Sequence, residues 1–152
     1  RGEPLAIRDT RTREAIATLQ DTLDVDAVTA IWDAAIEAHP WPGPPVWIHG
    51  DLQSGNLLAQ HGRLSAVIDF GCLGVGDPAC DVMAAWIFLS AETRDVFRAA
   101  LQVDEATWAR GRGWALSVGL IALPYYQDTN PALAGIARRA IHEALADYSA
   151  SG

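Results

Sequence analysis

Apolar residues recur at helical spacing near the beginning of the chain. Weak patterning over residues 12–19 predicts a first helix, and a clearer pattern follows over residues 25–38. There, apolar side chains occupy the i, i+3, i+4, i+7 and i+8 positions of one face, which is typical of an amphipathic helix packed on a core. These positions are Val28, Ile31, Trp32, Ala35 and Ile36. The proline-rich run at residues 42–45 ends this helix.

The middle of the chain has the pattern of strands and turns. The apolar run at residues 46–48 predicts a short buried strand. Apolar residues at 57–59 and 64–70 flank a turn-forming His-Gly pair at residues 61–62, so we expect a β-hairpin. These strands would form a small β insert over residues 46–70 in a chain that is otherwise helical.

Helical spacing returns after the hairpin and continues toward the end of the chain. Asp77 followed by Pro78 predicts a helix start, because Asp caps free backbone N–H groups and Pro fits the first helical position. We expect Pro124 to stop a later helix, since its ring clashes with the preceding turn. The helices predicted here span residues 77 to about 89, 91–101, 104 to about 123, and 131–148.

The predicted elements describe one domain of the α+β class that is predominantly helical. The chain has 152 residues, of which 50% are hydrophobic and 20% charged, as in a globular domain. Its formal net charge of −8 gives no attraction for nucleic acid or an anionic membrane. The longest apolar stretch, residues 114–126, is well short of the roughly 20 residues that span a bilayer. We therefore expect a soluble cytoplasmic protein that binds neither nucleic acid nor membrane.

The numbers of lysine and cysteine residues exclude some kinds of catalytic chemistry. All 11 basic residues are arginine, so the chain has no lysine for a P-loop or for a Schiff base. The two cysteines, Cys72 and Cys80, do not form a C-x-x-C pair. We expect both to be reduced thiols, as is usual in a cytosolic protein.

Candidate chemistry is concentrated in the β insert. Asp51 follows the first predicted strand, and Asn56 comes five residues later. With a turn at residues 61–62, Asn56 lies nearly opposite Val67, and Asp69 is one or two residues further along. The hairpin would therefore bring an amide oxygen and a second carboxylate close to Asp51. Such oxygen donors suit Mg²⁺, and a carboxylate left free could accept the proton of a hydroxyl nucleophile, as phosphoryl transfer requires.

Three motifs, in this order along the chain, resemble those of a known family. His-Gly-Asp-Leu-Gln-Ser-Gly-Asn at residues 49–56 is similar to the protein-kinase catalytic loop, and Asp-Phe-Gly at residues 69–71 is similar to the kinase metal-binding element. Gly-Asp-Pro-Ala-Cys-Asp at residues 76–81 resembles the segment that follows in the aminoglycoside phosphotransferase family. The resemblance implies the fold of a protein-kinase-like C-terminal lobe, whose small β-hairpin insert carries the catalytic and metal loops.

The resemblance also implies roles for the polar residues of these motifs. Asp51 resembles the catalytic base that accepts the proton of the attacking hydroxyl. Asn56 and Asp69 resemble Mg²⁺ ligands that also contact the nucleotide, with Asp69 bridging the phosphates of ATP or GTP. The resemblance also implies that Gln53 contacts the nucleotide, at a position where the family usually has His or a basic residue. The residues implied to support the catalytic loop are His49 and Asp81.

Parts of the family's nucleotide-binding site are missing from the sequence. The family uses a Gly-rich loop over the phosphates and a lysine paired to a helix Glu, whereas this chain has no lysine. We therefore expect residues 1–152 to form the C-terminal lobe, with an N-terminal nucleotide lobe upstream in the same polypeptide. The isolated lobe should have little or no activity.

The implied reaction is ATP-dependent transfer of a phosphate to a hydroxyl of a small molecule. The acidic composition suits a cationic acceptor, and Asn56 also resembles the aminoglycoside-directed branch. We therefore expect an aminoglycoside acceptor and a role in antibiotic resistance. Choline, homoserine, sugars and macrolides are the alternative acceptors, because a fold does not fix a substrate.

Two other functions are open on the residues alone. A metal-dependent hydrolase could use His49 and Asp51 as ligands together with Asp69 or Asp81. A nucleotide-binding module could use the glycines of residues 71–76 between a strand and a helix. Their G-x-x-G-x-G spacing differs from the dinucleotide fingerprint, which weakens that alternative.

Overall fold

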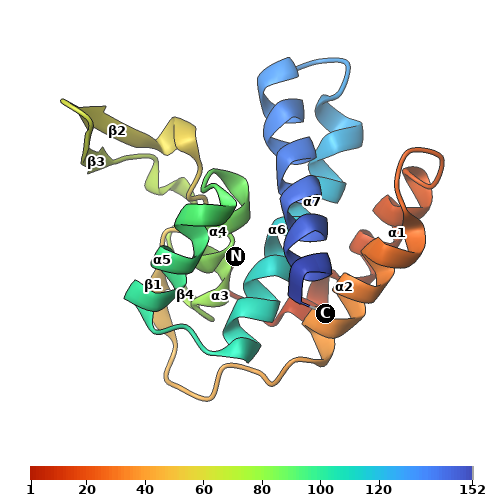
Figure 1. The fold of residues 1–152 in the computed structure, drawn as a ribbon, viewed down its shortest axis with the longest axis horizontal. Coiled ribbons are helices and arrows are strands. Elements are labelled where there is room, and N and C mark those ends of the chain that lie inside the picture. The colour runs from red at the N-terminus through yellow and green to blue at the C-terminus, as the bar shows by residue number, and fades with distance from the viewer. Residues whose placement is uncertain (152) are drawn as a thin grey trace.

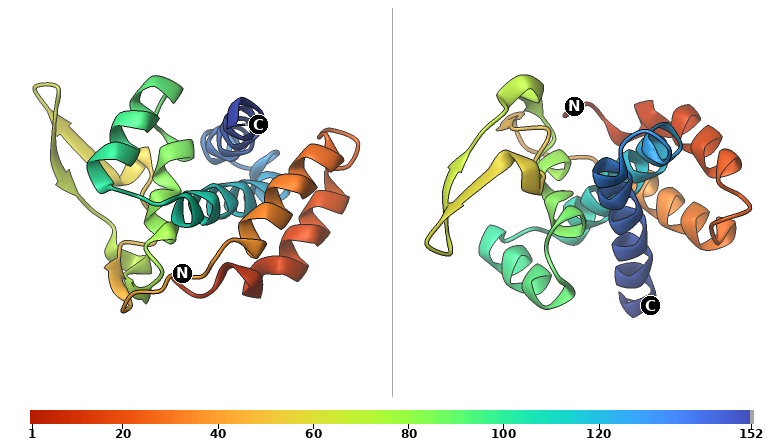
Figure 2. Two further views of the ribbon diagram at one scale, coloured as in Figure 1. Left: turned by 60° about the horizontal axis from the view of Figure 1, so that its bottom comes forward. Right: turned by 90° about the horizontal axis from the view of Figure 1, so that it is seen from above.

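The computed structural model describes residues 1–151. Its α-helices are α1 (Asp9–Thr18), α2 (Val25–Glu37), α3 (Ala79–Val82), α4 (Ala84–Ile87), α5 (Ala91–Leu101), α6 (Glu105–Tyr126) and α7 (Pro131–Ser151). The long helices α6 and α7 lie side by side in the middle of the molecule, with α1 and α2 on one side of them (Figure 1). A β-hairpin projects on the other side, beyond α3, α4 and α5 (Figure 2).

The strands form two antiparallel sheets of two strands each. Strand β1 (Val46–Ile48) pairs with β4 (Gly74–Gly76), and β2 (Leu57–Gln60) pairs with β3 (Arg63–Val67) to form the hairpin. The β2–β3 register places Leu57 opposite Val67. This register confirms the predicted hairpin and its turn. Asn56 comes just before Leu57 and therefore lies nearly opposite Val67, as predicted.

Helix α6 is the centre of the hydrophobic core. It packs against α1, α2, α3 and α7, and glycines allow two of these helices to approach closely. A Cβ atom at Gly113 would lie 2.4 Å from the Ala35 Cβ on α2, and one at Gly111 would lie 2.7 Å from Val82 Cγ1 on α3. The largest fully buried side chains include Trp32, Trp86, Ile31, Met83, Leu116 and Leu120. No helix within residues 1–151 is both long and apolar enough to cross a bilayer.

The prediction that Pro124 ends the long helix is wrong. Helix α6 continues through Pro124 to Tyr126, and the N–H of Gln127 closes the following turn on the carbonyl of Leu123 at 2.9 Å. A proline inside a helix removes one backbone hydrogen bond and costs about 3 kcal/mol. Packing of α6 against α7 along this segment offsets that cost, since Leu120 and Leu123 are both buried.

Three other predicted elements need correction. The helix expected from residue 77 to about residue 89 is two short helices, α3 and α4, separated by a turn at Met83, and Leu89 lies outside both. The strand at residues 46–48 is not buried throughout, because Trp47 is 75% exposed. It pairs on one side only, with the short strand β4. Strand β3 ends at Val67 instead of continuing to Phe70, because the chain turns at Asp69 into the 3-10 helix η3 (Phe70–Cys72).

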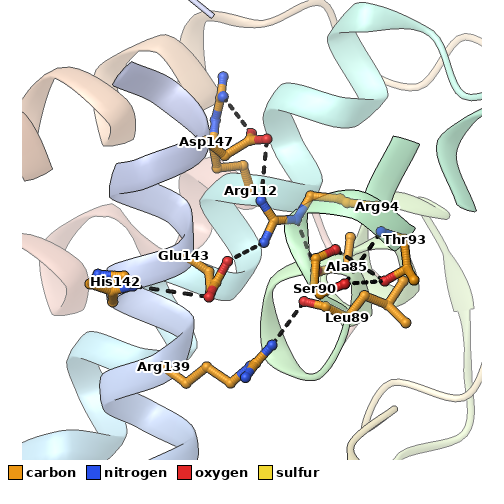
Figure 3. Close-up of polar contacts among 10 residues, drawn as sticks. All are labelled: Ala85, Leu89, Ser90, Thr93, Arg94, Arg112, Arg139, His142, Glu143 and Asp147. Carbon is orange, nitrogen blue, oxygen red and sulfur yellow. Dashed lines mark hydrogen bonds and ion pairs between the residues drawn. The ribbon is translucent and has the colours of Figure 1, made fainter. Parts of the chain in front are cut away.

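A buried network of ion pairs joins four helices. Arg94 of α5 is 3% exposed, donates to the carbonyl of Ala85 at 3.1 Å and pairs with Glu143 and Asp147 of α7. Arg112 of α6 donates to Asp147 at 2.9 Å, so both arginines meet on this carboxylate (Figure 3). The network fixes α7 against α4, α5 and α6. Because these helices form one wall of the region next to the hairpin, that wall is fixed as well.

Candidate active site

The segment between β1 and the 3-10 helix η2 (Ser54–Asn56) is held by a carboxylate from α3. Asp81 accepts a hydrogen bond from the backbone N–H of His49 at 2.7 Å and a second from that of Gly50 at 2.8 Å. Gly50 has φ of +79°, and a Cβ there would lie 2.5 Å from the carbonyl oxygen of Cys72. Only glycine fits this turn, and the turn presents both N–H groups to Asp81.

His49 uses both of its ring nitrogens inside the protein. Its Nδ1 accepts a hydrogen bond from the backbone N–H of Asp51 at 3.3 Å, and Nε2 lies 2.9 Å from the carbonyl oxygen of Ile68. Because Nδ1 accepts, the ring proton is on Nε2 and is donated to Ile68. The ring is 7% exposed and packs against Phe70, with 4.8 Å between the ring centroids. Neither nitrogen is available for a metal ion, which weakens the metal-hydrolase alternative.

Asp51 presents one hydrogen-bonded and one open carboxylate oxygen. Its Oδ2 accepts hydrogen bonds from Nε2 of Gln53 and Nδ2 of Asn56, each at 3.2 Å. Its Oδ1 lies 3.9 Å from Nη2 of Arg1 and accepts no hydrogen bond from any residue within 1–151. The side chain is 32% exposed. Two amides therefore fix the carboxylate through Oδ2 and leave Oδ1 without a hydrogen bond.

Asn56 is fixed by the same contacts. It is 6% exposed, and its Nδ2 also donates to the carbonyl of Asp51 at 2.9 Å. Since Nδ2 is committed to Asp51, the oxygen Oδ1 of Asn56 is the free end of the amide, and no donor within the described chain contacts it. An amide oxygen held in this way is a suitable ligand for a hard cation.

Asp69 follows Ile68, whose backbone is hydrogen-bonded to that of Asn56. It forms no hydrogen bond or ion pair with Asp51 or Asn56 within residues 1–151. Its neighbour Ile68 donates its backbone N–H to the carbonyl of Asn56 at 2.9 Å. Asp69 itself is in the left-handed region at φ of +61°, and its Oδ1 accepts from the N–H of Gly71 at 3.4 Å. A positive φ is uncommon for residues other than glycine, and Asp adopts it more readily than most.

The donor set around Asn56 and Asp69 is small. No group of three or more His, Cys, Asp or Glu residues in the described chain could hold a metal ion. Mg²⁺ is commonly held by one or two protein oxygens, with the rest of its shell supplied by water and substrate phosphates. One carboxylate and one amide oxygen therefore suit Mg²⁺ on a nucleotide better than a metal site built from protein ligands alone.

A cavity of about 320 Å³ opens beside Asp51. Asp51, Gln53 and Cys72 form its polar edge, and the opposite wall comes from α4, α6 and α7. That wall consists of Ile87, Val118, Gly119, Ala122, Tyr126, Leu133, Ile136, Ala137 and Ala140, and Arg1 completes the lining. A larger cavity of about 450 Å³ lies near Trp41 and contains none of the candidate residues.

The comparison with known families agrees with this geometry. A family model described as the phosphotransferase enzyme family (APH) matches residues 2–114. The chain belongs to this phosphotransferase family. Membership confirms the predicted aminoglycoside-phosphotransferase-like family and the kinase-like, predominantly helical α+β fold. No curated protein and no solved structure matches the chain.

The phosphotransferase match ends within α6. It includes every candidate residue from His49 to Asp81, and it stops at Trp114. The second half of α6 and the whole of α7 lie beyond it, and these segments provide most of the apolar wall beside Asp51.

Sequence reasoning missed several residues around the site. Cys72 and Arg1 border the cavity, although neither was a candidate residue. The sequence predicts Asp77 as a helix cap, and its Oδ1 does accept from the N–H of Ala79 at 2.9 Å. It also pairs with the buried Arg110 of α6 at 2.7 Å, a contact across 33 positions that no local pattern indicates. For Cys72, the adjacent glycine-rich segment was the only available signal.

Proposed function

We propose that this phosphotransferase moves the γ-phosphate of ATP to a hydroxyl group of a small molecule, with Asp51 as the catalytic base. The observation that carries the proposal is the state of the Asp51 carboxylate. Two amides fix its Oδ2, its Oδ1 accepts no hydrogen bond within residues 1–151, and the residue borders a cavity of about 320 Å³. A positioned carboxylate with one open oxygen is suited to accept a proton.

The reaction balances with this arrangement. The acceptor hydroxyl oxygen forms a bond to the γ-phosphorus, the bond from that phosphorus to the β–γ bridging oxygen breaks, and ADP leaves. The hydroxyl proton passes to Oδ1 of Asp51. Gln53 and Asn56 keep the carboxylate aligned for this transfer, because each donates a hydrogen bond to Oδ2. The aligned base and the bound alcohol then require little reorganisation.

Asn56 and Asp69 would hold Mg²⁺ on the nucleotide phosphates. The free Oδ1 of Asn56 and the carboxylate of Asp69 are the oxygen donors of the site, and each is held by hydrogen bonds to neighbouring residues. When bound, Mg²⁺ neutralises charge on the phosphates. Asp69→Asn should therefore weaken binding of Mn²⁺, used as a paramagnetic probe in place of Mg²⁺, to the ATP complex. The substitution Asp51→Asn should weaken it much less.

His49 and Asp81 are positioning residues in this proposal. Asp81 holds the N–H groups of His49 and Gly50, while His49 holds the N–H of Asp51 and the carbonyl of Ile68. The two residues thus connect the loop of the base to the strand that leads to Asp69. Their effect on turnover would be indirect, through the direction in which Asp51 points.

We also propose that nucleotide binding is completed by a lobe outside these 152 residues. The sequence has no lysine, and a kinase-like enzyme needs one to hold the phosphates on the side opposite the catalytic loop. Residues 1–152 alone would then turn over little, whereas a polypeptide that also contains the nucleotide lobe would be active.

The test is acceptor-dependent release of ADP from Mg²⁺-ATP by the natural polypeptide. The acceptor panel contains aminoglycosides, macrolides, choline, homoserine, simple sugars and hydroxy acids. Release of ADP that depends on one class of acceptor, with phosphate found on its hydroxyl, supports the proposal. Hydrolysis of phosphate esters without ATP would contradict it and favour a hydrolase.

A further inference from the structure

The cavity beside Asp51 continues into a second cavity. The second has a volume of about 310 Å³ and shares four lining residues with the first. The shared residues are Arg1, Val118, Ala122 and Tyr126. The second cavity adds Arg8 and Arg11 from the η1 (Leu5–Arg8) and α1 segment, together with Ile121 and Tyr125 of α6. A ligand with its hydroxyl at Asp51 could therefore extend along the apolar face of α6 toward these arginines.

We call the two connected cavities the double cavity. The net charge of its lining side chains is opposite in sign to the net charge of the whole chain. The whole chain has a formal net charge of −8. Among the described lining residues, Asp51 is the only acidic one, and the second cavity contains no acidic residue. Arg1, Arg8 and Arg11 all line it. Arg1 also lies beside Asp51, so the guanidinium groups of Arg8 and Arg11 are the ones that make the far end attractive to an anion and repulsive to a cation.

Arg8 is half-buried and has no carboxylate partner within the described chain. Its Nε donates to the hydroxyl of Ser117 at 2.9 Å, and its guanidinium lies 4.9 Å from the centre of the Trp114 ring. Burial, followed by repulsion from Arg1 and Arg11, lowers the pKa of Arg8 to about 10. An anion placed between these arginines would remove part of that electrostatic cost.

We propose that the acceptor is an amphipathic hydroxy compound with an anionic group, such as a hydroxy carboxylate, and that Arg8 and Arg11 bind the anion. The inference rests on the proposed function, because Asp51 defines the hydroxyl end. The apolar body of the acceptor lies against Val118 and Ala122. A polycationic aminoglycoside suits this lining poorly, since its ammonium groups would face the arginines and only one carboxylate.

The test compares three six-carbon alcohols whose other end carries an anionic, a neutral or a cationic group. These probes are 6-hydroxyhexanoate, 1,6-hexanediol and 6-amino-1-hexanol, and binding to the natural polypeptide is followed by NMR titration at low ionic strength without nucleotide. We expect the carboxylate to bind on the order of tenfold more tightly than the diol, as a charge-assisted contact allows. The amino alcohol should bind most weakly, and added salt should reduce the preference.

The arginine variants identify the anion subsite. Arg11 is exposed on α1, so Arg11→Gln should fold normally and reduce the preference for the carboxylate about three- to fivefold, the effect of an exposed charge pair. The charge reversal Arg11→Glu should reduce it further. Arg138→Gln is the matched control, because Arg138 is exposed on α7 and lines none of these cavities. An unchanged preference in both Arg11 variants would overturn the assignment.

Binding and turnover separate this inference from the proposed function. Tighter binding of the carboxylate without any acceptor-dependent ADP would support the anion subsite and contradict the kinase reaction. Acceptor-dependent ADP with equal binding of the three probes, with preference for the amino alcohol, or with binding of none of them, would support the reaction and overturn the anionic acceptor.

Discussion

Asp81 accepts a 2.7 Å hydrogen bond from the backbone N–H of His49, which lies 32 positions earlier in the chain. The contact joins α3 to the turn that carries Asp51. With its other oxygen, Asp81 holds the next N–H of the same turn at 2.8 Å. A carboxylate suits this place because both of its oxygens accept and neither donates.

Asp81→Asn should destabilise the protein and loosen this turn. The new amide group would place a donor against one of the two N–H groups and leave it unsatisfied, at a cost of about 1–3 kcal/mol. Urea unfolding measures the change in stability, and hydrogen exchange of the His49 and Gly50 amides measures the loosening. Asp128→Asn, at an exposed position, is the control. Equal stability of the two variants would show that Asp81 does not hold the turn.

The two cysteines should differ sharply in reactivity. Burial raises the pKa of the Cys80 thiol, so this thiol stays protonated and inaccessible near neutral pH, while Cys72 is exposed at the edge of the cavity. The folded protein should react with one equivalent of a thiol reagent at pH 8, and with a second only after unfolding. Cys72→Ser should remove the fast reaction and Cys80→Ser should leave it. Rapid labelling of both thiols in the folded protein would contradict the structure.

A methyl group at Gly119 should push α6 and α7 apart. Its Cβ would lie 2.8 Å from the carbonyl oxygen of Ala137 and 3.0 Å from Cγ1 of Ile141, so Gly119→Ala should cost about 1–3 kcal/mol. Gly135→Ala is the matched control on α7, because nothing lies within 4 Å of its Cβ. The control should be more stable than the wild type by about 0.5–1 kcal/mol. Thermal unfolding of both variants provides the comparison, and similar stabilities would be inconsistent with the close helix packing.

Arg94 should be far more important for stability than Arg98, an arginine of the same helix whose carboxylate partner is exposed. Arg94→Met leaves Glu143 without its arginine in the buried network and should cost about 3–5 kcal/mol. Arg98 pairs with Glu105, whose side chain is 89% exposed, so Arg98→Gln should cost no more than about 1 kcal/mol. Urea unfolding separates the two variants. Equal losses would mean that the buried network does not hold α7.

The sequence was sufficient to predict those features whose structure is determined by neighbouring residues. The hairpin followed from a turn pair between two apolar runs, and helix α5 begins and ends at the predicted residues, 91 and 101. The juxtaposition of Asp51 and Asn56 also followed, since they are five residues apart in one loop. In each case the contacts are local, so short patterns contain the necessary information.

The remaining features depend on packing between distant segments. Pro124 would break an isolated helix, but α7 lies against α6 and stabilises it. The pairing of Asp77 with Arg110 depends on how α6 packs against α3. The position of Arg8 near the cavity depends on how η1 and α1 pack against α6. No local spacing in the sequence specifies these contacts, so only the three-dimensional structure could identify the wall beside Asp51.

The most direct test of the account is single-turnover phosphate transfer by Asp51→Asn in the natural polypeptide. With Mg²⁺-ATP and the acceptor that supports ADP release, the variant should lose on the order of a thousandfold in rate, as expected for a general base. Its affinity for Mg²⁺-ATP should be nearly unchanged, and Asp21→Asn, at an exposed position, should behave as wild type. A transfer rate for Asp51→Asn close to that of the wild type would contradict the assignment of Asp51 as the base.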